Sequence, residues 1–113
     1  MNFDQYNTNN NYNNYYQFNQ FQNSLNLKVL ENRNFDNDMI DYGVIIINKA
    51  YNLMNKKLDI AIYISDSFNS KYPEKGNHWV CFILPFSYTG CRYYASYSIC
   101  YSTGKEEILI FVD

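Results

Sequence analysis

The sequence predicts an α+β domain with one main helix followed by a small, mostly antiparallel sheet. Apolar residues recur every three or four positions from Ile40 to Leu58, which is the period of an amphipathic helix. They alternate from Leu58 to Ile64, and they form nearly unbroken runs over 78–84 and 108–112, as strands do. A chain of 113 residues has room for one modest core, and therefore for one domain.

Residues 1–24 differ in composition from the rest of the chain. They contain nine Asn, four Gln and seven aromatic residues, but no Leu, Ile or Val. Such a segment buries too little apolar surface to offset its ordering entropy, so we expect a disordered Asn/Gln/Tyr-rich tail. Its polar and aromatic residues favour self-association through amide ladders and ring stacking. Sequence drift without function is the simpler explanation, because such tracts are assigned on composition alone.

The predicted domain spans residues 25–113 and opens with a short edge strand or an extended segment at 25–30. Polar sequence then leads to the main helix, where Asp36 or Asp38 can accept from the amides of the first turn. Lys56 and Lys57 suit its last turn. The apolar stripe of this helix consists of Ile40, Val44, Ile47, Tyr51, Met54 and Leu58.

Strands are predicted for the rest of the domain. The alternating residues 58–64 indicate a strand that ends at the turn Ser65-Asp66-Ser67, and 69–77 indicate a polar loop. The run 78–84 is typical of a central strand covered on both faces, with Pro85 ending it. The pattern further predicts β structure at 92–101, a turn at 102–105 and a second buried strand at 108–112.

The net charge and the available His, Cys and Gly residues exclude several classes of function. Nine basic against eleven acidic residues give a net charge of −2, so no nucleic acid or acidic membrane is expected as a partner. The single histidine and the spacing of Cys81, Cys91 and Cys100 fit no zinc site, and no glycine-rich phosphate loop is present. No metal or cofactor is therefore predicted. The number of cysteines is odd, and the N-terminal sequence does not resemble a secretory leader. Both features indicate free thiols in an intracellular protein, cytoplasmic or nuclear.

The dipeptide His78-Trp79 is the candidate for chemistry. An imidazole at the start of a strand is a natural general base near neutral pH, and alternation sends Trp79 to the opposite face, where it can anchor the strand. A strand-end histidine without a role is the simpler interpretation of the dipeptide alone.

The order of three segments resembles the ubiquitin-like-protein-specific cysteine proteases of the SUMO-protease type. Residues 35–42 open a helix, His78-Trp79 begins a strand, and a last strand runs into Asp113. The resemblance covers only the N-terminal part of that catalytic domain and implies a partial papain-like fold. It implies that His78 is the general base and that Asp113 orients it. It further implies that Trp79 packs beside the base and that Asn37, Asp38 and Ile40 begin a helix on the substrate side.

Two departures from that family concern the nucleophile and the pairing of His78 with Asp113. The family places its catalytic Cys after the Asp, beyond residue 113, while Cys81 points to the other face of its strand. Cys91 and Cys100 precede the Asp. In a three-strand meander His78 and Asp113 would lie at opposite ends, so they meet only if residues 87–104 loop out.

Two functions are weighed on this basis. The leading interpretation is a truncated or degenerate thiol peptidase, a fragment without its nucleophile, that binds or acts on a ubiquitin-like protein or peptide. The alternative is a small non-enzymatic interaction or assembly protein that uses a Tyr-rich sheet and the Asn-rich tail. Thirteen tyrosines supply the amphipathic contact area that protein interfaces favour.

Overall fold

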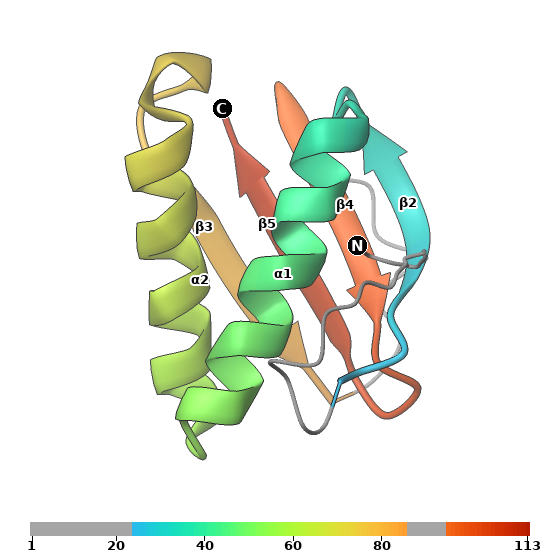
Figure 1. Ribbon diagram of the computed structural model, residues 1–113. Helices are drawn as coiled ribbons and strands as arrows, with labels where there is room; N and C mark the ends of the chain where they lie inside the picture. The colour runs from blue at the N-terminus through green and yellow to red at the C-terminus, as the bar shows by residue number, and fades with distance from the viewer. Residues whose placement is uncertain (1–23, 86–94) are drawn as a thin grey trace.

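The computed structural model describes residues 24–85 and 95–113, which form an α+β fold. Two helices lie side by side on one face of a four-stranded antiparallel sheet (Figure 1). The α+β class is therefore confirmed. In chain order the elements are β2 (Lys28–Arg33), α1 (Asn37–Leu53), α2 (Lys57–Lys71), the 3-10 turn η1 (Pro73–Lys75), β3 (Val80–Leu84), β4 (Tyr97–Ser102) and β5 (Glu107–Val112).

The helix α1 begins where its cap was expected. The Asp36 carboxylate accepts from the backbone N–H of Met39 at 2.9 Å, which satisfies one of the free amides of the first turn. The predicted end at Leu58 was wrong, because Met54 is extended (φ −133°, ψ 155°) and ends the helix. Lys56 and Lys57 consequently stand at the start of α2, not in the last turn of α1.

The predicted strand 58–64 was also wrong, because these residues form the first half of α2. The apparent alternation comes from two stripes that are each spaced by four. Ile60, Ile64 and Phe68 are buried against the core, while Leu58 and Ile62 form a second stripe that is 72% and 48% exposed. A surplus apolar stripe interleaved with the buried one mimics a period of two.

The predicted turn Ser65-Asp66-Ser67 and the start of the predicted loop at residue 69 are helical as well. Inside α2 the hydroxyl of Ser67 donates to the carbonyl of Tyr63 at 2.8 Å, so this polar side chain is satisfied without a turn. The helix ends only at Lys71, and η1 begins after the single residue Tyr72.

The sheet has the order β2-β4-β5-β3, with each neighbouring pair antiparallel. Among the described strands β3 pairs with β5 alone, so it is an edge strand, and the prediction of a central strand at 78–84 was wrong. Its apolar run has another origin. Trp79, Cys81 and Ile83 pack into the core, whereas Phe82 lies on the other face, 47% exposed, with its ring 5.7 Å from that of Phe111.

The remaining strands agree with the sequence pattern. The edge strand near residue 25 occurs slightly later, as β2, and β5 matches the predicted strand at 108–112. Gly104, with φ +93°, forms the turn between β4 and β5, where a residue with a side chain would be strained. The tail at residues 1–23 and the predicted β structure at 92–94 lie outside the described residues.

An aromatic cluster joins the helices to the start of β3. Trp79 is fully buried, 5.1 Å from Phe68 and 5.8 Å from Phe35 between ring centroids. Its indole N–H donates to the carbonyl of Tyr72 at 2.9 Å, so the only polar atom of the side chain has a partner inside the core. The packing role expected of Trp79 is thus visible, as a structural anchor of the fold.

Candidate functional site

The strands β3 and β5 bring the two predicted catalytic residues to the same end of the sheet. Val80 pairs with Phe111 in the antiparallel ladder, and the same register continued by two residues sets His78 across from Asp113. The meander in which they would lie at opposite ends does not occur, since β5 lies directly between β3 and β4. No hydrogen bond or ion pair joins these two side chains within the described residues, and their catalytic roles stay a prediction.

The described thiols lack the properties of a nucleophile. Cys81 is buried on the core side of β3, and burial strongly raises the pKa of its thiol. Burial raises the pKa of Cys100 to about 12, and the nearby Glu107 carboxylate, 3.7 Å from the sulfur, contributes to this shift. Because the thiolate is the reactive form, we expect both thiols to react slowly near neutral pH. Cys91 lies outside the described residues.

The residues expected to bind substrate at the start of α1 are part of the packing of that helix. Asn37 and Asp38 lie in its first turn, directly after the capping Asp36. The carbonyl of Ile40 accepts from the hydroxyl of Tyr101 at 2.7 Å, which ties α1 to β4. A helix start and a buried Trp account for the short motif that resembled the protease.

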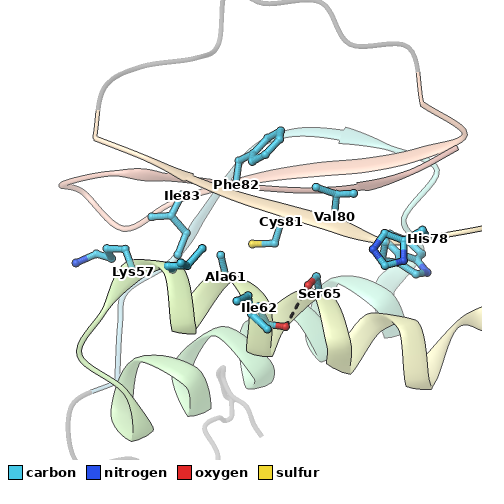
Figure 2. Close-up of a pocket in the computed structure, with 11 residues that line it drawn as sticks. Lys57, Ala61, Ile62, Ser65, His78, Val80, Cys81, Phe82 and Ile83 are labelled. Atoms are coloured by element: carbon cyan, nitrogen blue, oxygen red, sulfur yellow. Dashed lines mark hydrogen bonds between the residues drawn. The ribbon is translucent and has the colours of Figure 1, made fainter.

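A groove runs between α2 and the outer edge of β3, in a place that the sequence did not indicate (Figure 2). Its volume is about 330 Å³. It is lined by Lys57, Leu58, Ala61, Ile62 and Ser65 from α2 and by His78, Trp79, Val80, Cys81, Phe82 and Ile83 from β3 and the residues before it. Lys57 and His78 stand at opposite ends, and most of the lining between them is apolar (Figure 2).

The groove follows the edge of β3 and not merely one of its faces. Cys81 points toward α2, whereas Phe82 points away from it (Figure 2), yet both contribute to the lining. Residues from the two faces of a strand border one groove only where it passes the strand's edge. Alternate residues of an edge strand turn their backbone N–H and C=O groups outward, away from the neighbouring strand. The site therefore offers backbone donors and acceptors beside apolar side chains.

The exposed stripe of α2 makes the second wall of the groove. Leu58 and Ile62 remain exposed although the same helix buries Ile60 and Ile64 completely. Sequence reasoning missed these two residues because it placed them with Ile60 and Ile64 on one face of a strand. The second apolar stripe is the signal that could have revealed them, because a helix that packs on a sheet needs only one such stripe.

The described residues contain neither a metal-binding cluster nor a membrane-spanning helix. No group of three His, Cys, Asp or Glu side chains among them could hold a metal ion. None of the helices in this part of the chain is long and apolar enough to cross a lipid bilayer. An apolar groove along a strand edge has the shape and lining that suit an extended chain.

Comparison with solved structures identifies the architecture. Two structures of the dynein light chain-like domain of the Fasciola hepatica calcium binding protein FhCaBP2 superpose on this chain. The P6422 native form gives a TM-score of 0.64 at 17% identity over 80% of this chain and 94% of that domain. The mercury derivative gives 0.61 at 18% identity over 77% and 91%. The fold is dynein light chain-like. No family model and no curated protein matches the sequence.

The dynein light chain-like fold overturns the resemblance to the SUMO-protease type. Neither the partial papain-like domain nor the hydrolase, thiol protease and ubiquitin-like processing functions inferred from it are supported, and the interpretation as a degenerate peptidase was wrong. The resemblance depended on a few residues that this fold uses for capping and packing.

Proposed function

We propose that this protein is a small non-enzymatic interaction module. It holds an extended segment of a partner protein in the groove, as an added strand along the edge of β3 that pairs with no other described strand. The observation that carries this proposal is that exposed Leu58 and Ile62 border the edge of a strand that has one partner in the described sheet. Strand addition supplies affinity through main-chain hydrogen bonds and specificity through side-chain pockets.

The exposure of apolar side chains along this edge supports the proposal. Leu58, Ile62 and Phe82 are 72%, 48% and 47% exposed, and all three line one groove. Scattered exposed apolar residues are ordinary on a protein surface, but a contiguous set beside unpaired backbone is typical of an interaction site. An extended peptide in this groove would cover the apolar side chains and at the same time form backbone hydrogen bonds with the edge of β3.

The other edge of the sheet offers a useful comparison. The strand β2 is also an edge, but it carries Lys28, Glu31 and Arg33 and has an irregular register between Val29 and Glu31. Charged residues and bulges protect an edge against strand addition. The protein thus has one edge with protecting features and one edge beside an apolar groove, which supports β3 as the binding edge.

A peptide-display selection tests the proposal with random sequences in place of a natural partner. A random peptide library is selected on the immobilised full chain, and the affinity of the recovered peptides is measured for the wild type and two variants. Ile62→Glu puts a carboxylate into the groove, while Leu53→Glu makes the same change at a 61% exposed apolar residue that does not line it.

We expect Ile62→Glu to weaken binding by about tenfold or more, equal to about 1.4 kcal/mol, and Leu53→Glu to leave the affinity unchanged. Circular dichroism and thermal unfolding of both variants show that the fold is kept. Equal effects of the two substitutions, or a selection that enriches no peptide, would overturn the proposal.

A further inference from the structure

We propose that a second pocket, between the start of α1 and the end of α2, binds an arginine side chain of a partner protein. The pocket has a volume of about 440 Å³, and none of its residues lines the groove along β3. The two helix ends that form it lie at the same end of the molecule as η1 (Figure 1). Because this surface is separate from the groove, arginine binding here does not depend on the function proposed above.

Negative charge is in excess in this pocket. Its lining holds two ammonium groups against four carboxylates, those of Asp36, Asp38, Asp41 and Glu74. Asp36 is engaged as the cap of α1, but the other three form no ion pair with the part of the chain that the structure describes. Asp38 and Asp41 are three positions apart and so project from the same side of α1. Burial and the nearby Asp38 raise the pKa of Asp41, so a cation beside it would stabilise a carboxylate that the free protein holds unfavourably.

The spacing of these carboxylates favours an organic cation over a metal ion. Within the described ranges 24–85 and 95–113, no three His, Cys, Asp or Glu side chains are grouped closely enough to hold a metal. A guanidinium spreads its charge over a plane with five N–H donors, so it can contact carboxylates that do not converge on one point. It is also the side-chain cation that most often stacks on aromatic rings.

Two tyrosine rings supply the aromatic wall of the pocket. Tyr42 and Tyr72 meet nearly at right angles, with 5.6 Å between their ring centroids. Tyr42 is held in place, because its hydroxyl donates to the carbonyl of Ser67 at 3.2 Å and its ring lies 5.2 Å from that of the buried Phe68. The Nζ of Lys71 lies 5.7 Å from the centroid of the Tyr42 ring. The ring is therefore a fixed surface that a cation can reach.

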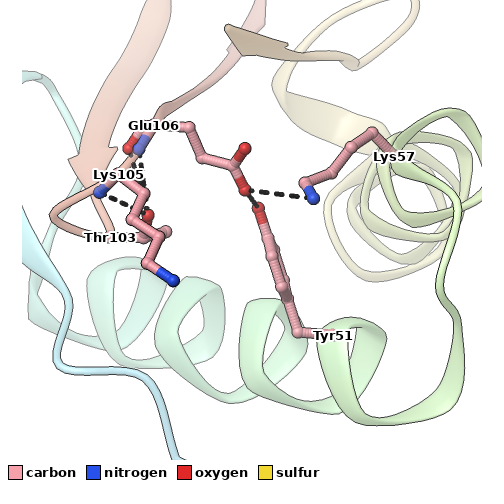
Figure 3. A network of polar contacts seen from close by, with 5 residues as sticks. All are labelled: Tyr51, Lys57, Thr103, Lys105 and Glu106. Atoms are coloured by element: carbon pink, nitrogen blue, oxygen red, sulfur yellow. Dashed lines mark hydrogen bonds and ion pairs between the residues drawn. The ribbon is translucent and has the colours of Figure 1, made fainter. Parts of the chain in front are cut away.

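A complete version of this arrangement occurs at the other end of the helix pair. The Nζ of Lys57 lies 5.8 Å from the centroid of the Tyr51 ring and 3.6 Å from a carboxylate oxygen of Glu106 (Figure 3). Ring, carboxylate and cation there all belong to this chain. Lys71 and Lys75 also lie over tyrosine rings, but neither pairs with a carboxylate of the described residues. The pocket thus has rings and unpaired carboxylates, and a partner's arginine would join them.

Titration with short capped peptides tests this assignment. Nuclear magnetic resonance of the isotope-labelled full chain gives the affinity for acetyl-Gly-Arg-Gly-amide and for the same peptide with lysine or citrulline in place of arginine. Citrulline keeps the size and planarity of arginine but carries no charge. We expect it to bind at least about tenfold more weakly, and lysine about threefold more weakly. The resonance changes should centre on residues 38–42 and 71–75.

Substitutions in the pocket should change the affinity in both directions. Asp38→Asn and Asp41→Asn should each weaken binding of the arginine peptide by about threefold or more. Asp59→Asn is the matched control, because Asp59 is also exposed in the first turn of a helix but lines neither the pocket nor the groove. Lys71→Gln should strengthen binding by about two- to threefold, since it removes an ammonium that competes for the Tyr42 ring. Mere damage to the pocket would not tighten binding.

Three results would overturn this inference and leave the function of the groove untouched. They are equal affinities for the arginine and citrulline peptides, the absence of saturable binding, and weaker binding by Lys71→Gln. Free arginine distinguishes a protein partner from a small molecule. Its own carboxylate is repelled by the excess negative charge of the pocket, so it should bind more weakly than the capped peptide. Tighter binding of free arginine would overturn the assignment to a partner protein.

Discussion

Asn69, in the last turn of α2, holds the backbone of Trp79, directly before β3, with both polar groups of its side-chain amide. The amide oxygen accepts from the N–H of Trp79 at 2.8 Å, and the amide nitrogen donates to the carbonyl of the same residue at 3.4 Å. These two bonds join the two walls of the groove at its His78 end. The spacing between α2 and β3, and with it the width of the groove, depends on this pair.

Substitution Asn69→Ala is expected to lower the free energy of unfolding by about 1–3 kcal/mol. It leaves the partly buried N–H and C=O groups of Trp79 without their partner, and the cost of such groups is of that size. Urea unfolding measures the change. Asn52→Ala is the control, because Asn52 is exposed and bonds only within its own helix. Equal effects of the two substitutions would contradict the role given to Asn69.

Substitution Gly43→Ala should destabilise the protein, although Ala has a higher helix propensity than Gly. A Cβ at residue 43 would clash with the hydroxyl oxygen of Tyr101, which donates to the carbonyl of Ile40. The side chain or the helix must shift, so we expect a loss of about 1–3 kcal/mol in the free energy of unfolding. Tyr101→Phe removes that oxygen, and the double variant should therefore lose less than the sum of the single variants. Strict additivity would show that the close approach is not the cause.

Stability is expected to fall steeply at alkaline pH. Burial raises the pKa of Tyr51, Tyr72 and Tyr101 in the folded protein, to about 12 for Tyr72, against about 10 in an unfolded chain. The unfolded chain therefore releases these protons first, and the stabilisation present below pH about 10 is lost as pH rises toward the folded pKa values. Urea unfolding across this range measures the slope. Tyr51→Phe should make it shallower, and an unchanged slope would contradict this account.

The described thiols should be inert in the folded protein. In a Cys91→Ser background, only Cys81 and Cys100 can react with a disulfide reagent such as dithionitrobenzoate. Both are buried with raised thiol pKa values, so labelling near pH 7 should occur only on unfolding and slow when the protein is stabilised. Rapid labelling of Cys81 under native conditions would instead restore thiol chemistry as a possibility for this protein.

Local patterns predicted the helix α1 and the strand β5. The predicted stripe packs on the core as far as Met54, alternate residues of β5 pack on the same core, and Asp36 caps its helix through a bond that spans three residues. The helix α2 was mistaken for a strand because Leu58 and Ile62 serve the groove while Ile60 and Ile64 serve the core. The residues that broke the pattern of a simple helix are those of the candidate site.

The place of β3 could not be predicted from its own residues. An apolar run does not tell a central strand from an edge strand, because the distinction depends on which other strands pair with it, and β5 follows more than twenty residues later. The dipeptide His78-Trp79 was predicted to carry chemistry; in the structure Trp79 anchors the aromatic core and His78 lines the end of the groove. Self-association through residues 1–24 and an intracellular location stay predictions.

Amide hydrogen exchange tests the central claim most directly. The exchange of backbone amides is compared in the free protein and in the protein saturated with a display-selected peptide. Strand addition predicts slower exchange at the outward amides of Val80–Leu84 and no change along Lys28–Arg33. Protection along Lys28–Arg33, or peptide binding that leaves the exchange of Val80–Leu84 unchanged, would contradict the account.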